Sequence, residues 1–424
     1  YHSVPPQVKP LGSDGRSHLP RAEDIPFSEA LFVKLGAHTH AKSLPPKKHS
    51  FVGTQSCSAT GCHGAVKGNG PDVSYTRFTS EDPHTRAFLL LYTQPSLDIY
   101  RRLTNQPQAK FEDQAYFAFL QQKCVGCHAT PPADTSGPTQ PESYAAGVSC
   151  ESCHGPAASW QYTHFNKQAK QSAKMRNLAD LSVRATACAE CHIGPQVSGE
   201  QTYDVNHDLI ASGHPRLTFE FEAQLANLPA HWNAAKNVKS HFEAWRTGEL
   251  ATATQQEKLH ASRDEHEFAS FRCFDCHHGL TANPTSGRLS FPPRTGISQN
   301  VRTRLAELSP SPKAQATMLL ELLKLAEGQQ AAGSPGIGWE EHVQFSLALA
   351  AYCADNPQNA ALAKDTETLQ QILSKSFRTL PRDKQLTSEP FFIGGPYDSP
   401  TGYDAHKERL KQVRENIQTS LTPP

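Results

Sequence analysis

Five cysteine–histidine motifs hold almost all of the cysteines in this sequence. Four of them read Cys-x-x-Cys-His, and a longer version with four residues between its cysteines precedes them. In chain order, the motifs are Cys57, Cys62 and His63; Cys124, Cys127 and His128; Cys150, Cys153 and His154; Cys188, Cys191 and His192; and Cys273, Cys276 and His277. Together they use ten of the eleven cysteines and leave only Cys353, which we expect to be a buried thiol.

The spacing within each motif suits covalent attachment of haem c. Two thiols three positions apart can each form a thioether to one porphyrin, and the histidine that follows can bind the iron from the proximal side. A single motif could instead be half of a zinc site or a redox dithiol, and ten cysteines could also form five disulfides. Because a histidine follows the second cysteine of every motif, we favour haem attachment, with five haem c groups covalently bound.

The second axial ligand of each iron decides what such a protein can do. Met175 and Met318 are the only methionines, so at most two of the five irons could have His/Met ligation. We therefore expect two histidines on most irons, and low reduction potentials. The sequence context favours five histidines as second ligands: His84, His164, His207, His214 and His278.

The local sequence around each of these histidines explains why it is a candidate second ligand. His84 stands at the start of an apolar helical stretch, and His164 follows the third motif by ten residues. His207 and His214 are seven residues apart, which is two turns of a helix, although Gly213 predicts that a helix ends before His214. The fifth candidate directly follows the proximal histidine of the last motif, so it points in another direction and could serve a different haem.

Composition narrows the class of protein. Hydrophobic residues make up only 37% of the 424 residues, so we expect the porphyrins to supply much of the core. The 41 basic and 41 acidic residues cancel, which argues against a nucleic-acid partner. No apolar run of membrane-spanning length occurs, so we expect no transmembrane segment. Haem c is attached outside the cytoplasm, and we expect a periplasmic or extracellular protein.

The pattern of residues predicts a mainly α protein with much irregular structure. We expect an extended N-terminal arm over 1–50, a pentahaem domain over 51–285 whose core is formed by haems, a linker over 286–299 and a haem-free helical domain over 300–424. Apolar residues recur at helical spacing in several stretches. The predicted helices cover 87–100, 111–122, 168–181, 238–262, 301–327, 339–353, 360–380 and 405–421.

The chain also resembles a known family of multihaem cytochromes. They are related to the tetrahaem cytochrome c that accepts electrons from hydroxylamine oxidoreductase in nitrifying bacteria. The residues that carry the resemblance lie within about 50–285 and read VGTQSCSATGCHG, SEDPHTRAF, GVSCESCHGPAASWQYTH and ATACAECHIGP, with NHDLIASGHPRLTFEF and FRCFDCHHGL resembling a pentahaem branch. The resemblance implies closely stacked haem pairs, with His84 and His164 as second ligands to haems other than those of their nearest motifs. The first motif departs from the family pattern by its two additional residues.

Electron transfer is the leading functional hypothesis. On this view the chain relays electrons between redox protein partners and is not an enzyme. One alternative is a pentahaem reductase or oxidase that acts on a small nitrogen compound at an open haem, although nitrite reductases of that class bind their catalytic haem through CxxCK. The other alternative is a protomer of an extracellular cytochrome filament, or a subunit of a larger complex or homo-oligomer.

Overall fold

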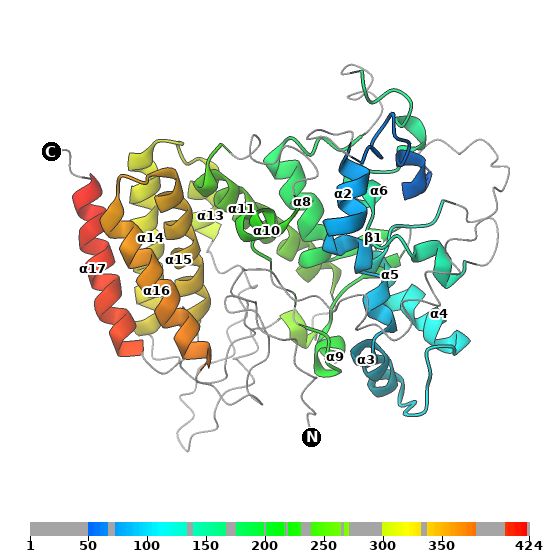
Figure 1. Cartoon of the computed structure of the whole chain (residues 1–424). Helices are drawn as coiled ribbons and strands as arrows, with labels where there is room; N and C mark the ends of the chain where they lie inside the picture. Colours follow the sequence, from blue (N-terminus) through cyan, green and yellow to red (C-terminus); the bar gives the residue numbers. More distant parts are fainter. Residues whose placement is uncertain are drawn as a thin grey trace. The chain divides into compact units, whose positions relative to one another are not determined.

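The computed structural model (Figure 1) describes most of the chain between residues 50 and 421. The described residues are 50–66, 73–133, 139–166, 175–198, 201–215, 217, 219–229, 239–263, 267–270, 299–331, 337–378 and 403–421. The predicted arm apart from Ser50, nearly all of the predicted linker and the whole fifth motif lie outside these ranges. The described part is mainly α-helical, as predicted. None of its helices is long and apolar enough to cross a bilayer.

The chain divides into two compact units. The described residues from 50 to 214 belong to the first, and those from 219 to 225 and from 239 onwards belong to the second. The helix over 241–262, which was predicted to belong to the haem domain, therefore groups with the helices from 299 onwards. The predicted boundaries near 285 and 300 stay predictions, because the described ranges break off at 270 and resume at 299.

The first unit consists of short helical segments joined by irregular chain, with one small hairpin. Its α-helices are α2 (Ser74–Glu81), α3 (Gln94–Thr104), α4 (Gln114–Lys123), α5 (Val125–His128), α6 (Cys150–His154), α8 (Leu181–His192) and α9 (His207–Ala211). Its 3-10 turns are η2 (Thr54–Cys57), η4 (Pro83–Arg86), η5 (Leu89–Tyr92), η6 (Pro141–Tyr144) and η7 (Ala157–Ser159). Strands β1 (Gln196–Ser198) and β2 (Gln201–Tyr203) pair antiparallel.

Local residue choice explains how these segments begin and end. The predicted helix over 87–100 is split, because Thr93 is extended and Pro95 sits in the first turn of α3, where proline is tolerated. The helix then ends at Asn105, which adopts a left-handed conformation with φ of 54°. The Asp180 side chain caps α8 by accepting the Ser182 N–H at 2.8 Å. Residues 175–180 are not helical, so the prediction of a helix over 168–181 is wrong for these residues.

Aromatic side chains form the apolar centre of the first unit. Phe88, Tyr100 and Tyr116 are almost completely buried and belong to one cluster that α3, α4 and α5 share. The rings of Tyr100 and Tyr116 lie 5.1 Å apart, edge to face. The Tyr116 hydroxyl donates to the Leu91 carbonyl, which satisfies its buried polar end. This cluster holds the second motif, since its two cysteines pack against it.

The second unit is a helical bundle with an aliphatic core. Its α-helices are α11 (His241–Ser262), α13 (Gln299–Ala306), α14 (Pro312–Ala331), α15 (Ile337–Asp355), α16 (Ala360–Arg378) and α17 (Tyr403–Leu421), α10 (Phe221–Asn227) begins in this unit, and η9 (Phe268–Ser270) is a short 3-10 turn. Helices α14 to α17 lie side by side in Figure 1, and α11 packs against α13 and α15. Cys353 is buried in this core, as expected, and its sulfur lies 3.6 Å from Thr366 Oγ1.

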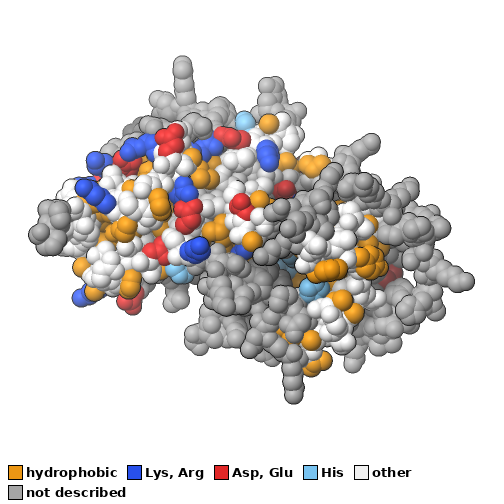
Figure 2. Space-filling view, turned by 90° about the horizontal axis from the view of Figure 1, so that it is seen from above, with side chains coloured by type: hydrophobic (Ala, Val, Ile, Leu, Met, Phe, Trp, Pro, Cys, Tyr) orange, Lys and Arg blue, Asp and Glu red, His pale blue; other side chains and the backbone are white. Residues whose placement is uncertain are grey.

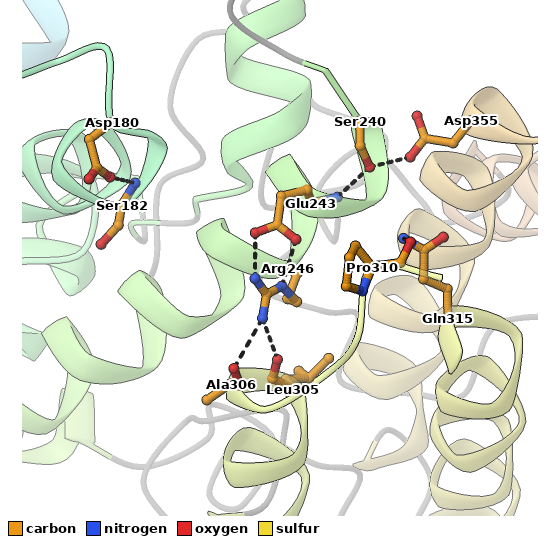
Figure 3. Close-up of polar contacts among 10 residues, drawn as sticks. All are labelled: Asp180, Ser182, Ser240, Glu243, Arg246, Leu305, Ala306, Pro310, Gln315 and Asp355. Atoms are coloured by element: carbon orange, nitrogen blue, oxygen red, sulfur yellow. Dashed lines mark hydrogen bonds and ion pairs between the residues drawn. The ribbon is translucent and has the colours of Figure 1, made fainter. Parts of the chain in front are cut away.

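Polar contacts fix the start of α11 (Figure 3). The Asp355 carboxylate accepts the His241 N–H at 2.7 Å, the Phe242 N–H at 2.9 Å and the Ser240 hydroxyl at 2.5 Å. The two backbone groups are among the unsatisfied donors that a helix leaves at its N-terminus.

A second set of contacts in Figure 3 joins α11 to α13. Arg246 pairs with Glu243 and donates to the Leu305 carbonyl at 2.7 Å. The predicted helix over 301–327 is divided into α13 and α14 by a short connection that contains Pro310.

Candidate haem-binding centre

A helical turn forms much of each of the second, third and fourth motifs. In α6 and the last turn of α8, the two cysteines are three positions apart and the histidine follows, so all three lie on one side of the helix. In the second motif, Cys124 is the residue before α5, and Cys127 and His128 lie in that helix. The first motif is different, since η2 ends at Cys57 and a turn returns the chain, with the Cys62 N–H donating to the Ala59 carbonyl at 2.8 Å. The two additional residues of that motif are accommodated in this turn.

Three of the motif histidines face a second histidine from a distant segment. The ring centroids of His63 and His164 lie 5.8 Å apart, those of His192 and His84 lie 6.2 Å apart, and those of His128 and His214 lie 6.4 Å apart. Two imidazoles that bind one metal ion from opposite sides, each through a nitrogen at about 2 Å, hold their centroids roughly 6 Å apart. The three pairs therefore have the separation that axial ligands of one iron require.

Hydrogen bonds set which ring nitrogen of these histidines can bind metal. Nδ1 of His128 donates to the Ala87 carbonyl at 2.9 Å, and Nδ1 of His164 donates to the Gln161 carbonyl at 2.8 Å. Nδ1 of His63 lies 3.1 Å from a serine hydroxyl, that of Ser74. With Nδ1 engaged in this way, Nε2 is the nitrogen that can bind metal, and the partner fixes the ring orientation.

His84 has a stronger partner than these histidines. Its Nδ1 donates to the Asp82 carboxylate at 2.8 Å, and Asp82 is 4% exposed. This contact was not predicted from the sequence, although Asp82, Pro83 and His84 are consecutive and aspartate commonly caps the turn that follows it. Gly147 helps to place the same histidine, because a Cβ there would lie 2.4 Å from the His84 carbonyl.

The environment favours neutral imidazoles. Loss of solvent lowers the pKa of His192 to about 4, and the neighbouring His84 and His128 add to the effect. Desolvation also lowers the pKa of His128. A histidine must be unprotonated to bind metal. The surroundings of both motif histidines therefore hold them in the form that binds iron.

Cysteines of different motifs also come together. A hydrogen bond from Cys150 lowers the pKa of the Cys57 thiol to about 7, and Cys191 has a side-chain hydrogen bond with Cys127 that raises its pKa. Cys153 lies close enough to Cys191 for their charges to interact. The first motif thus adjoins the third, the third adjoins the fourth, and the fourth adjoins the second. The attachment points form a row in the order first, third, fourth, second.

Two further features fit a porphyrin at these positions. The Trp160 ring is buried between His154 and His164, at 6.5 Å and 5.5 Å, and the described residues give its Nε1 no hydrogen-bond partner. A porphyrin propionate is an acceptor that could satisfy a buried indole N–H. Exposed apolar side chains also lie within three residues of His63 or His164 in the sequence, namely Val66, Tyr162 and Phe165. Figure 2 shows hydrophobic and histidine side chains next to one another on the face in view.

The third motif is anchored by its own glutamate. Glu151, between the two cysteines of that motif, is 1% exposed and accepts the backbone N–H groups of Gly53 at 2.8 Å and Ala157 at 2.7 Å. Nearby, burial raises the pKa of the Cys153 and Cys188 thiols to about 12. Among the described residues, no three His, Cys, Asp or Glu side chains converge as a metal site. The pairs therefore lack the four protein ligands of a structural zinc site.

The structure places three of the five predicted second ligands opposite a motif histidine. It brings His84, His164 and His214 opposite motif histidines. Helix α9 ends at Ala211, before His214, as expected. His207 begins α9, and its role as a ligand stays a prediction.

The fifth motif is the part of the predicted site that the described residues do not reach. Four predicted site residues lie outside the described ranges: Cys273, Cys276, His277 and His278. The expected thioethers from Cys273 and Cys276, the proximal ligand His277 and the second ligand His278 are therefore not placed beside any of the pairs above. A fifth haem at this motif stays a prediction from the sequence.

Comparison with known proteins gives a family match. Residues 56–155 match the model of a family described as cytochrome c554 and c-prime. That segment contains the first three motifs from Cys57 to His154, together with His84. No curated protein and no solved structure matches the chain. The match confirms the resemblance to multihaem cytochromes c of this kind, and it supports covalently bound haem c and a c-type cytochrome role in electron transfer.

Proposed function

We propose that this chain is a multihaem c-type cytochrome that relays electrons between redox proteins in the periplasm or outside the cell. The observation that carries the proposal is the set of three histidine pairs at 5.8 to 6.4 Å, each joining a motif to a distant segment. A bound haem c supplies an iron that accepts and releases one electron. Two axial imidazoles leave no open position on the iron, which favours electron transfer over chemistry on a substrate.

The positions of the motif residues and of the histidines opposite them suggest a role for each. The motif cysteines hold the five haem c groups through thioethers, and the motif histidines provide the proximal ligands. We assign His164 as the second ligand for the first motif, His214 for the second and His84 for the fourth. The buried Arg184 guanidinium lies beside Cys188, where it could pair with a porphyrin propionate.

The row of attachment points supports a relay. Each described motif has at least one cysteine beside a cysteine of another motif, as with Cys57 and Cys150 or Cys127 and Cys191. The chain therefore keeps its electron carriers close together over the whole described part of the first unit. Electrons entering near the first motif would leave near the second, or the reverse, and the partners would be redox proteins that dock near those two ends.

Spectroscopy of the purified holoprotein tests the proposal. The intact mass should exceed that of the polypeptide by five haem groups, and the oxidised absorption and EPR spectra should be dominated by low-spin iron. His164→Ala and His214→Ala should each convert one haem to the high-spin form. His260→Ala, an exposed histidine of α11, serves as the control and should leave the spectra unchanged. A resting protein dominated by high-spin haem, or variants that keep every low-spin haem, would contradict the ligation.

The fifth motif is tested by the same mass measurement. A double variant, Cys273→Ala with Cys276→Ala, should lower the intact mass by one haem group while the other four stay attached. His277→Ala should keep the thioethers and alter the spectrum of one haem. A double variant whose mass still carries as many haem groups as the parent would show that the fifth motif holds no haem.

A further inference from the structure

His84, one of the proposed axial ligands, differs from the others in its hydrogen bonds to a carboxylate, that of Asp82. The same carboxylate oxygen, Asp82 Oδ1, accepts Nδ1–H of His84 at 2.8 Å and its backbone N–H at 2.9 Å. Asp82 is extended at the start of η4, and Pro83 follows it, so the backbone itself holds the carboxylate against the ring. The carboxylate is almost completely buried, and water therefore competes little for these bonds.

Three other ligands have neutral groups at Nδ1. His128 and His164 donate to backbone carbonyls, and His63 lies against the Ser74 hydroxyl. A carboxylate on the outer nitrogen of an imidazole makes that imidazole a more basic ligand than a neutral acceptor does. A more basic ligand favours Fe(III) over Fe(II), because it compensates the higher charge. Hydrogen bonding to an axial ligand is one of the ways a protein sets haem potential.

We propose that Asp82 is a positioning residue that, through His84, gives the iron held by His84 and His192 a lower reduction potential than the irons of the other two histidine pairs. The inference rests on the proposed function, since it needs His84 to be an axial ligand. The fourth motif lies inside the row of attachment points, between the third and the second. An electron passing along the row therefore meets an uphill step at this position.

The fourth motif carries a second acidic group that acts in the same direction. Glu190 lies between Cys188 and Cys191, and its carboxylate pairs with Arg176 at 3.1 Å. The arginine offsets part of that charge, and both side chains are partly exposed, so solvent screens the pair. Asp82 is the more deeply buried carboxylate and the one that touches the ligand. It is the residue to change.

The test is a redox titration of the full holoprotein by protein-film voltammetry, with Asp82→Asn. Asparagine keeps an acceptor oxygen and removes the charge. Outer partners of metal ligands typically change affinity by about 10- to 100-fold. A tenfold change in the preference for Fe(III) over Fe(II) is about 59 mV for one electron. We expect one midpoint potential to rise by at least this amount while the others stay in place.

Two further variants keep the result interpretable. Asp82→Ser offers a neutral hydroxyl and a good N-cap, so it should raise the same potential even if the asparagine variant folds poorly. Ser74→Ala removes the neutral partner of His63 and should produce a smaller change, on a different haem. EPR of the oxidised protein reports whether each variant keeps its low-spin haems.

The outcomes separate this inference from the proposed function. If His84→Ala leaves every low-spin haem in place, His84 is not a ligand and the assigned ligation fails. If His84→Ala converts one haem to high spin, but neither Asp82 variant shifts a potential, the ligation stands and the role of Asp82 is refuted. A shift in Ser74→Ala as large as in the Asp82 variants would also refute it, because the charge would then not be the cause.

Discussion

Replacing Glu249 by glutamine should stabilise the second unit at neutral to alkaline pH. Glu249 lies in α11 and is 9% exposed, and Glu220, just before α10, is 2% exposed. The two segments are in close contact, because a Cβ at Gly248 would lie 2.5 Å from the Phe221 Cβ. Burial, and then the charge of Glu220, raise the pKa of Glu249 to about 8, and burial raises that of Glu220 to about 7.

The sign and size of the effect follow from proton linkage. An unfolded glutamate loses its proton near its ordinary pKa of 4.5, whereas Glu249 in the folded protein keeps it until about pH 8. Between these values the folded state binds more protons, so the free energy of unfolding falls as the pH rises. Each pKa unit corresponds to about 1.36 kcal/mol, so the fall between about pH 5 and pH 8 should be roughly 3 kcal/mol for this group. Glutamine cannot ionise and lacks this loss.

Unfolding of the holoprotein in denaturant provides the assay. Far-UV circular dichroism follows the helices, and the Soret band follows haem coordination. Glu249→Gln should flatten the fall in stability between about pH 5 and pH 8, and Glu220→Gln should flatten part of it. The control is Glu307→Gln, which changes an exposed carboxylate and should alter stability by less than about 0.5 kcal/mol. A Glu249→Gln protein with the pH dependence of the parent would refute the reasoning.

Three further predictions concern contacts within the two units. Glu151→Gln weakens the bonds that this buried carboxylate accepts from backbone N–H groups and should cost about 2–4 kcal/mol in the Soret-detected transition; no change would mean that the charge is dispensable. Gly147→Ala places a Cβ against the His84 carbonyl at a residue with φ of 63°, so absorption spectra should show partial loss of one low-spin haem, and a parental spectrum would contradict this. Asp355→Ala leaves backbone N–H groups at the start of α11 without their acceptor and should cost about 1–3 kcal/mol in thermal unfolding of the second unit, whereas an unchanged melting curve would show that these bonds are dispensable.

The motifs made the chemistry of the site predictable, but they did not show which distant histidine lies opposite each motif histidine. A Cys-x-x-Cys-His repeat fixes the attached group wherever the chain goes, because the chemistry is local. The partner of His63 lies at residue 164, and nothing in the intervening sequence marks that connection. The sequence context and the family resemblance single out His84 and His164 as candidate ligands, and both lie opposite motif histidines. The contact of the Asp82 carboxylate with the His84 ring was not predicted. An aspartate two residues before a histidine is more often interpreted as an N-cap, because its carboxylate can accept a backbone N–H of the turn that follows.

The helices were predicted best where apolar periodicity runs uninterrupted. Helices α15, α16 and α17 begin and end within two residues of the predicted limits. Prolines explain the main differences, since Pro95 and Pro310 divide stretches whose apolar spacing continues across them. Periodicity also could not show that α11 packs with α13 and α15, because an amphipathic helix does not specify which partner it covers.

The histidine pairs also bear on how such a chain matures. On the proposed ligation, each pair ties together positions roughly 90–110 residues apart, so each acts as a long-range cross-link that closes a large loop. A haem attached to the first motif during export must wait for residue 164 to emerge before its coordination is complete. The haem of the fourth motif can complete its coordination as soon as it is attached, since His84 precedes that motif in the chain. Truncation just after residue 200 should therefore leave the first and fourth motifs able to complete their coordination, while the second lacks its distal imidazole.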